Sequence, residues 1–191
     1  DPADARKIAR YTLDNWTELR QYVDMDNTRT QLKTLNSQFS FLMKQKVAAK
    51  ANLIALLDNT YPDVNKLFDS PVRDDGSEKW VDYAYSFWHV DCVRKIGLKT
   101  FTERYKAFCK KHHYNFQPSK PEELFHASKE LVAVFPKEKN YKLLIQQSIK
   151  QLNLASEHVE QLRKEMDALA SSLPEYTTVM NIYGVGKTYG P

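Results

Sequence analysis

The sequence predicts an all-α fold in which two long helices carry heptad spacing and a group of shorter helices is inserted between them. Three observations predict it. Only five of the 191 residues are glycine, and long runs of helix-forming residues are uninterrupted. Apolar residues recur at alternating steps of three and four in two separate stretches. The two stretches have similar lengths, so each is a suitable partner for the other.

The first element expected is a helix that starts at Asp1. An aspartate before Pro2 accepts hydrogen bonds from free amides, the proline fits the first turn, and Asp4 favours the positive helix end. Asp1 and Asp4 also share one helix face, where two carboxylates can hold a divalent metal ion. Both interpretations remain open from the residues alone.

The two long helices are expected from about 27 to 59 and from about 141 to 173. The first stripe is Leu32, Leu35, Phe39, Leu42, Lys46, Ala49, Leu53 and Leu56. The second stripe is Ile145, Ser148, Leu152, Ala155, Val159, Leu162, Met166, Leu169 and Leu173. A stripe this narrow needs a partner, so the two helices pair within one chain or between chains as a coiled coil. Lys46 and Ser148 are the polar exceptions that could fix the register.

The insert between them, from 61 to 139, is expected to form a helical cap at one end of the long helices. It opens with a loop containing Pro62, Pro71 and Gly76. Three amphipathic segments follow, which are "WVDYAYSFWHVDCVRKIG", "LKTFTERYKAFCKKHHYNF" and "KPEELFHASKELVAVF". Their aromatic residues recur at helical spacing and predict a small core: Trp80, Tyr83, Phe87, Trp88, Phe101, Tyr105 and Phe108.

Two features of the insert suggest chemistry. His89-x-x-Cys92 with Cys109-x-x-His112 has the spacing of a split zinc site, although buried helical cysteines have the same pattern. A basic run contains Arg94, Lys95, Lys99, Arg104, Lys106, Lys110 and Lys111. Of these, Lys106, Lys110 and Lys111 are the candidate contacts to a nucleic-acid backbone, and a solvated helix face is the alternative.

The composition permits a polyanionic partner and argues against a membrane protein. The net charge is +4, the pI is near 8.9, and the mean hydropathy is −0.61. No apolar run approaches the ~18 residues of a membrane span. Two cysteines do not suggest a secreted disulfide scaffold, so a reducing cytoplasm is the expected location.

The chain ends in a stretch that contains Gly186-Lys187-Thr188, the last residues of a phosphate-binding P-loop. That motif needs a glycine five positions before Gly186, where this chain has Asn181. A nucleotide-binding P-loop is therefore not expected. A turn after a helix is the simpler interpretation.

Several of these motifs together resemble a known family. They are "DPADARKIA" at the start, the two heptad helices, "KWVDYAYSFWH" from Lys79, and "ALASSLPEYTTVMNIYGVGKTYGP" at the end. The combination resembles the IS-one-ten type of insertion-sequence transposases, relatives of the Piv DNA invertase. The resemblance covers essentially the whole chain, in the family's order; Pro2 is a departure from the usual motif.

The resemblance implies a magnesium-dependent DNA transposase or recombinase with a RuvC-like nuclease domain, a coiled-coil domain and a C-terminal domain that supplies a serine. Asp1 and Asp4 match the last two acids of the DEDD set that binds Mg²⁺. The remaining acids and the serine would lie outside this sequence, so the chain is expected to be an internal fragment, inactive alone. The implied partners are DNA, a guide RNA in part of the family, and further copies of the chain in a dimer or tetramer. The implied location is the bacterial cytoplasm, at the nucleoid when the enzyme is active.

The implied domains are 1–25, the last helix of the nuclease domain; 26–175, the coiled-coil domain with its insert; and 176–191, the start of the C-terminal domain. In the family, the "YGVG" sequence looks like the hairpin of a helix-hairpin-helix, in which main-chain amides approach a DNA phosphate. Gly184, Gly186 and Lys187 would then be DNA contacts. Two other functions remain open: a non-enzymatic coiled-coil adaptor, and a zinc-stabilised nucleic-acid-binding module.

Overall fold

The computed structural model describes residues 1–17 and 26–182, and this part of the chain is helical with no strand. The all-α class is therefore confirmed. In chain order the elements are α1 (Pro2–Asp14), α2 (Asn27–Asp58), the 3₁₀ turn η1 (Val64–Lys66), α3 (Lys79–Ser86), α4 (Asp91–Arg94), α5 (Leu98–Lys111), α6 (Lys120–Glu130), α7 (Lys139–Ala170) and α8 (Tyr176–Met180).

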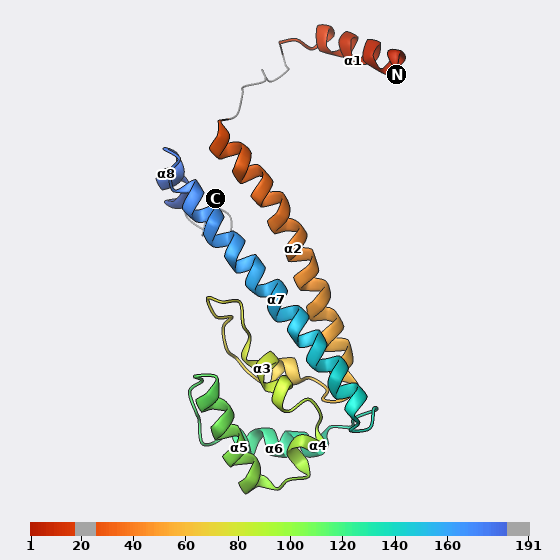
Figure 1. The fold of residues 1–191 in the computed structure, drawn as a ribbon, viewed down its shortest axis with the longest axis vertical. Coiled ribbons are helices and arrows are strands. Elements are labelled where there is room, and N and C mark those ends of the chain that lie inside the picture. Colours follow the sequence, from red (N-terminus) through yellow and green to blue (C-terminus); the bar gives the residue numbers. More distant parts are fainter. Residues whose placement is uncertain (18–25, 183–191) are drawn as a thin grey trace.

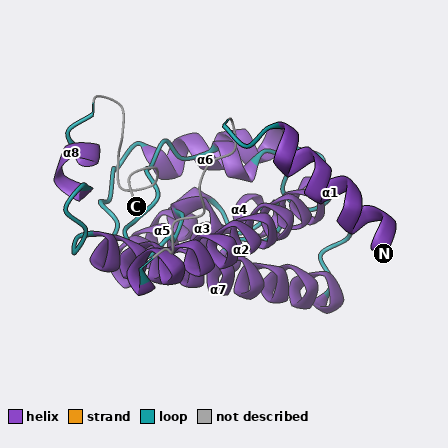
Figure 2. Ribbon diagram, turned by 90° about the horizontal axis from the view of Figure 1, so that it is seen from above, coloured by secondary structure: helices purple, strands orange, loops and turns teal. Residues whose placement is uncertain are grey.

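The helices α2 and α7 each have 32 residues and lie side by side in opposite directions (Figures 1 and 2). They pair within one chain, which the sequence left open. Every residue of the two predicted stripes is buried or half-buried. Apolar side chains at these positions pack against the other helix or the inserted helices, because water is excluded from a surface that two elements share.

Polar contacts fix how α2 and α7 are aligned. At one end, Arg29 of α2 forms ion pairs with Asp26 and with Glu175, which follows α7. The hydrogen bond from Arg29 lowers the pKa of the Glu175 carboxyl. Near the other end, the Asn52 amide donates to the Ser148 hydroxyl at 3.3 Å. Ser148, a polar exception in its stripe, thus has a partner on the facing helix.

The helices α3 to α6 lie beside the end of the α2–α7 pair where α2 ends and α7 begins (Figure 1). Their core is continuous with that of the long helices, because Leu53, Leu57, Ile145, Ile149 and Leu152 belong to the same buried cluster. The predicted aromatic core is confirmed, since all seven aromatic residues of that set are buried.

One predicted segment is broken in the structure. Residues 80–97 were expected as one amphipathic segment, but α3 ends at Ser86 and α4 begins at Asp91. In the gap, the Val90 amide donates to the Thr60 carbonyl at 3.0 Å. The His89 ring accepts from the Asp91 amide at 3.0 Å and its other nitrogen lies 3.0 Å from the Phe135 carbonyl oxygen. These contacts give the backbone partners outside a helix.

The loop before α3 lies against α7. Gly76 is buried with φ +80°, and a Cβ there would lie 3.0 Å from both Cβ and the carbonyl oxygen of Ser156. Only glycine allows this approach and this backbone conformation together. The loop explains why α7 buries Ser156 and Glu160 in addition to its stripe.

The start of α1 agrees with the predicted cap. The Asp1 carboxylate accepts from the Ala3 amide at 2.9 Å, Pro2 opens the helix, and Asp4 lies in the first turn. No residue of α1 is buried. Within residues 1–17 and 26–182, no helix is long and apolar enough to cross a membrane.

Candidate nucleic-acid interface

The basic run of the insert divides into a neutralised part and an unpaired part. Asp91 is buried and pairs with Arg94 at 2.6 Å and with Lys95 at 2.7 Å. These two cations compensate a carboxylate that is removed from water, which is a structural role. They are therefore poor candidates for contacting a polyanion.

The helix α5 carries the unpaired part. Its apolar face, which contains Phe101, Tyr105, Phe108 and Cys109, is buried in the core, so the opposite face points to solvent. The three predicted contacts on this helix, Lys106, Lys110 and Lys111, are all exposed. None of them pairs with a carboxylate in the described part of the chain.

Helical geometry divides these lysines between two flanks of α5. Because successive residues are ~100° apart, Lys106 and Lys110 lie one turn apart on one flank, whereas Lys111 lies on the other with Arg104. Lys110 and Lys111 also lie in the last turn, where positive charge interacts favourably with the helix dipole. Exposed ammonium groups of this kind can contact successive phosphates.

The structure does not assemble the candidate zinc ligands. Within residues 1–17 and 26–182, no three His, Cys, Asp or Glu side chains are grouped so that they could hold a metal ion. Both ring nitrogens of His89 already have partners within 3.0 Å. Cys109 is buried, Cys92 is half-buried, and Nδ1 of His112 lies 3.3 Å from a carboxylate oxygen of Asp82. Zinc binding stays a prediction, and metal analysis of the purified chain tests it.

The candidate magnesium ligands, Asp1 and Asp4, are both exposed and lie three residues apart on α1. Asp1 caps the helix, and Asp4 lies 3.8 Å from Lys7. Two carboxylates on one helix face fit Mg²⁺ as part of a ligand set, because this ion is often held by one or two protein carboxylates and keeps several waters. The remaining candidates, Gly184, Gly186 and Lys187, lie outside the described residues.

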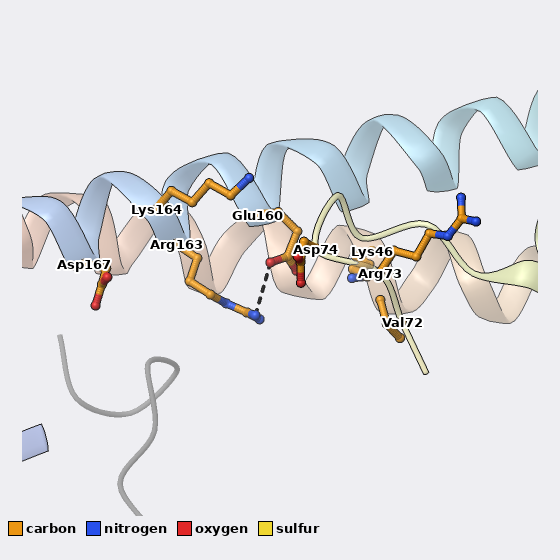
Figure 3. Close-up of a pocket in the computed structure, with 8 residues that line it drawn as sticks. All are labelled: Lys46, Val72, Arg73, Asp74, Glu160, Arg163, Lys164 and Asp167. Carbon is orange, nitrogen blue, oxygen red and sulfur yellow. Dashed lines mark ion pairs between the residues drawn. The ribbon is translucent and has the colours of Figure 1, made fainter. Parts of the chain in front are cut away.

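A charged cavity that the sequence did not predict lies between α2, α7 and the loop on α7. It measures about 600 Å³ and Figure 3 shows its lining: Lys46, Val72, Arg73, Asp74, Glu160, Arg163, Lys164 and Asp167. Arg163 pairs with the buried Glu160 at 3.1 Å, and Arg73 donates instead to the His112 carbonyl at 2.7 Å. The position of Lys46 within an apolar stripe was the one signal of this cavity.

Charges of both signs in this cavity favour a local ion network. The buried Nε of Arg163 has no hydrogen-bond partner within the described residues. Asp167 accepts from the Tyr176 hydroxyl, which links α7 to α8. Because acids alternate with cations here, the field for a polyanion is weaker than at the unpaired lysines of α5.

Comparisons with known proteins identify no relative of this chain. No protein-family model matches it. Neither the search of the curated proteins nor the search of the solved structures found a match.

Proposed function

We propose that this chain is the assembly and nucleic-acid-binding region of a DEDD-type DNA transposase. The observation that carries the proposal is the exposed face of α5, where Lys106, Lys110 and Lys111 have no carboxylate partner within the described residues. The motifs at both ends of the chain, which resemble those of the IS-one-ten type transposases, support the same assignment.

In this proposal α2 and α7 are a coiled-coil stalk and α3 to α6 are its cap. The covered stripes and the antiparallel arrangement support a coiled coil, in which side chains of one helix fit between those of the other. The stalk holds the cap and its lysines at the end where α2 ends and α7 begins, away from the end where Arg29 pairs with Glu175. Assembly with a second copy would present two such caps to one DNA.

The catalytic part of the proposal rests on Asp1 and Asp4. In the parent enzyme they would contribute to a magnesium site together with acids outside this sequence. Asp1 and Asp4 would help to hold the ion, which when bound would supply stabilisation of the charge that develops during phosphodiester cleavage. The 191-residue chain is expected to leave a DNA substrate intact in magnesium, since the resemblance assigns only two of the four acids, and not the serine, to its residues. Cleavage by this chain would contradict the assignment of these two residues.

Nucleic-acid binding tests the proposal directly. The affinity of the chain for a duplex is measured over a range of salt concentrations for the parent chain and for the Lys106→Glu, Lys110→Glu variant. Loss of two phosphate contacts makes the negative slope of log affinity against log salt concentration less steep by about 1.8. The matched control reverses Lys142 and Lys150, two exposed residues of α7. Equal affinity and slope for all three proteins would refute the interface.

A non-enzymatic coiled-coil adaptor is the second candidate, and the pairing of α2 with α7 within one chain favours it. Because α2 and α7 cover each other's apolar stripes within one chain, the helical hairpin can act as a spacer between other proteins without a second copy. The sequence of the full-length gene distinguishes the two functions. An Asp and a Glu encoded upstream, with a serine-containing domain encoded downstream, support the transposase. Their absence supports the adaptor.

A further inference from the structure

A second cavity, of about 350 Å³, lies on the other flank of α5. Four separate segments of the insert form it, and its lining is Ser86, Phe87, Cys92, Arg104, Ala107, Phe108, Lys111 and Lys137. The segments are the end of α3, the short helix α4, the outer flank of α5 and the residues before α7. The cavity is therefore a product of the tertiary structure.

The charge of this cavity has one sign. Arg104, Lys111 and Lys137 are its charged residues, and no Asp or Glu lines it. None of the three pairs with a carboxylate in the described part of the chain. Unpaired cations around a concave, low-dielectric surface focus the field and favour an anionic ligand.

Apart from the Ser86 hydroxyl and the Cys92 thiol, the rest of the lining is apolar. Phe87 and Phe108 belong to the core and are each only 5% exposed, so each contributes a small apolar area, and the exposed Ala107 adds a methyl group. A bare inorganic anion would leave this surface in contact with water. A ligand with a negative group and a flat apolar group matches both parts of the cavity.

We propose that this cavity binds one unpaired nucleotide of a single-stranded nucleic acid. The phosphate lies among Arg104, Lys111 and Lys137, and the base lies against Ala107 and the small exposed part of Phe87 and Phe108. An unpaired base is free to leave the stack and contact aromatic side chains, whereas the bases of a duplex are stacked and paired. The inference rests on the proposed nucleic-acid-binding function and assigns the two flanks of α5 to different forms of nucleic acid.

The two cysteines provide a direct readout of this cavity. Cys92 lines it and is half-buried. Cys109 is 1% exposed, and burial raises the pKa of its thiol, so it reacts slowly with alkylating reagents. The rate at which iodoacetamide alkylates the folded chain therefore reports on Cys92, and the Cys92→Ser variant measures the residual rate of Cys109.

The experiment measures this rate with oligothymidylate, with a duplex of the same length, and with inorganic phosphate, each at a concentration that saturates binding. We expect oligothymidylate to slow alkylation of Cys92 about tenfold, and the duplex and phosphate to change it less than twofold. In the Arg104→Gln, Lys137→Gln variant, the protection is lost. The negative slope of log affinity against log salt concentration for the oligonucleotide becomes less steep by about 0.7, because one phosphate contact is removed.

The control variant, Lys142→Gln with Lys150→Gln, removes the same charge from exposed positions outside the cavity and keeps both the protection and the slope. Thermal unfolding followed by circular dichroism verifies that each variant is folded. If a variant fails to fold, the protection experiment on the parent chain decides the question by itself.

The outcomes distinguish the cavity from the wider function. If oligothymidylate binds but Cys92 reacts at its free rate, the cavity assignment is wrong and nucleic-acid binding stands. Equal protection by inorganic phosphate or by the duplex also overturns the unpaired-nucleotide assignment. If neither form of nucleic acid binds the parent chain, both proposals fail.

Discussion

At the scale of single residues, a few positions decide geometry that the helices alone leave free. Gly76 brings the loop against Ser156 and Glu160 of α7 and thereby closes one side of the charged cavity. Tyr61 and Tyr83 place their hydroxyls 3.2 Å apart inside the aromatic core. Each of these residues joins segments that are distant in sequence, so its substitution has effects beyond its own element.

Replacing Gly76 by alanine is expected to lift the loop from α7. The new Cβ would meet Ser156 at 3.0 Å in a positive-φ conformation, so we expect a loss of about 1–3 kcal/mol in the free energy of unfolding. Hydrogen exchange at Ser156 to Glu160 should also accelerate. Gly97→Ala is the matched control, because Gly97 has φ +76° and a Cβ added there would meet nothing within 4 Å. It should lose stability without loosening α7, and an equal increase in exchange in both variants would contradict the contact.

The buried tyrosine pair predicts a fall in stability at alkaline pH. Burial raises the pKa of Tyr61 from 10.0 to about 12 and also raises the pKa of Tyr83 well above 10.0. The folded state then holds protons that the unfolded chain releases, so this stability is complete below pH 10 and is lost as the pH rises toward 12. Two pKa units correspond to about 2–3 kcal/mol for Tyr61.

Denaturant unfolding between about pH 8 and about pH 11.5 measures this loss in the parent chain and in Tyr61→Phe. The variant should be about 1 kcal/mol less stable at neutral pH, because the Tyr83 hydroxyl loses its partner. It should also lose less stability above pH 10. An identical alkaline loss in both proteins would mean that Tyr61 does not carry it.

At the scale of elements, the heptad stripes identify which face of each long helix is covered. The stripe of α7 is covered along its whole length, and its neighbours Ile149, Ser156 and Glu160 are buried as well. The extra burial arises because α7 packs on two sides, against α2 and against the insert with its loop. A heptad pattern describes only the first of these contacts.

Leu152 is expected to be a major contributor to stability, because it belongs both to the stripe and to the shared core. It is 1% exposed, so Leu152→Ala should lower the free energy of unfolding by about 2–5 kcal/mol. Leu143→Ala on the same helix is the control: Leu143 is 55% exposed and its truncation should change stability by less than about 0.5 kcal/mol. Similar costs at the two positions would contradict this packing.

At the scale of the whole molecule, a long helical pair carries a compact group of helices at one end (Figure 1). The open face of the pair exposes apolar and small residues, and Leu154 there is 53% exposed. A shallow groove between the helices on this face includes Ala48, Leu154 and Ala155. Small residues of this kind permit the close approach of a second helical pair.

We therefore expect the chain to form dimers in solution through this face. Sedimentation equilibrium should show a dimer that dissociates on dilution, and Ala48→Glu with Leu154→Glu, two exposed residues of the groove, should give a folded monomer. The substitution pair Lys142→Glu with Lys150→Glu adds acidic residues elsewhere and should leave the dimer intact. A parent chain that stays monomeric at every concentration would remove assembly from the proposed function.

Much of the fold could be predicted because it depends on local periodicity. The alternation of apolar residues located α2 and α7 and their covered faces, and helical spacing located the aromatic core. The break between α3 and α4 could not be predicted, because it depends on the Thr60 and Phe135 carbonyls, which are distant in sequence.

The candidate site shows the same division. The sequence by itself determined that α5 carries many cations and that Asp1 caps a helix, since composition and local capping are properties of short segments. Only the tertiary structure decided that Asp91, which pairs with Arg94 and Lys95 in its own helical turn, is buried, and that Lys137 joins Arg104 and Lys111 around one cavity. The physical reason is that burial and cavities depend on which segments lie against one another, and this is set by how the helices pack.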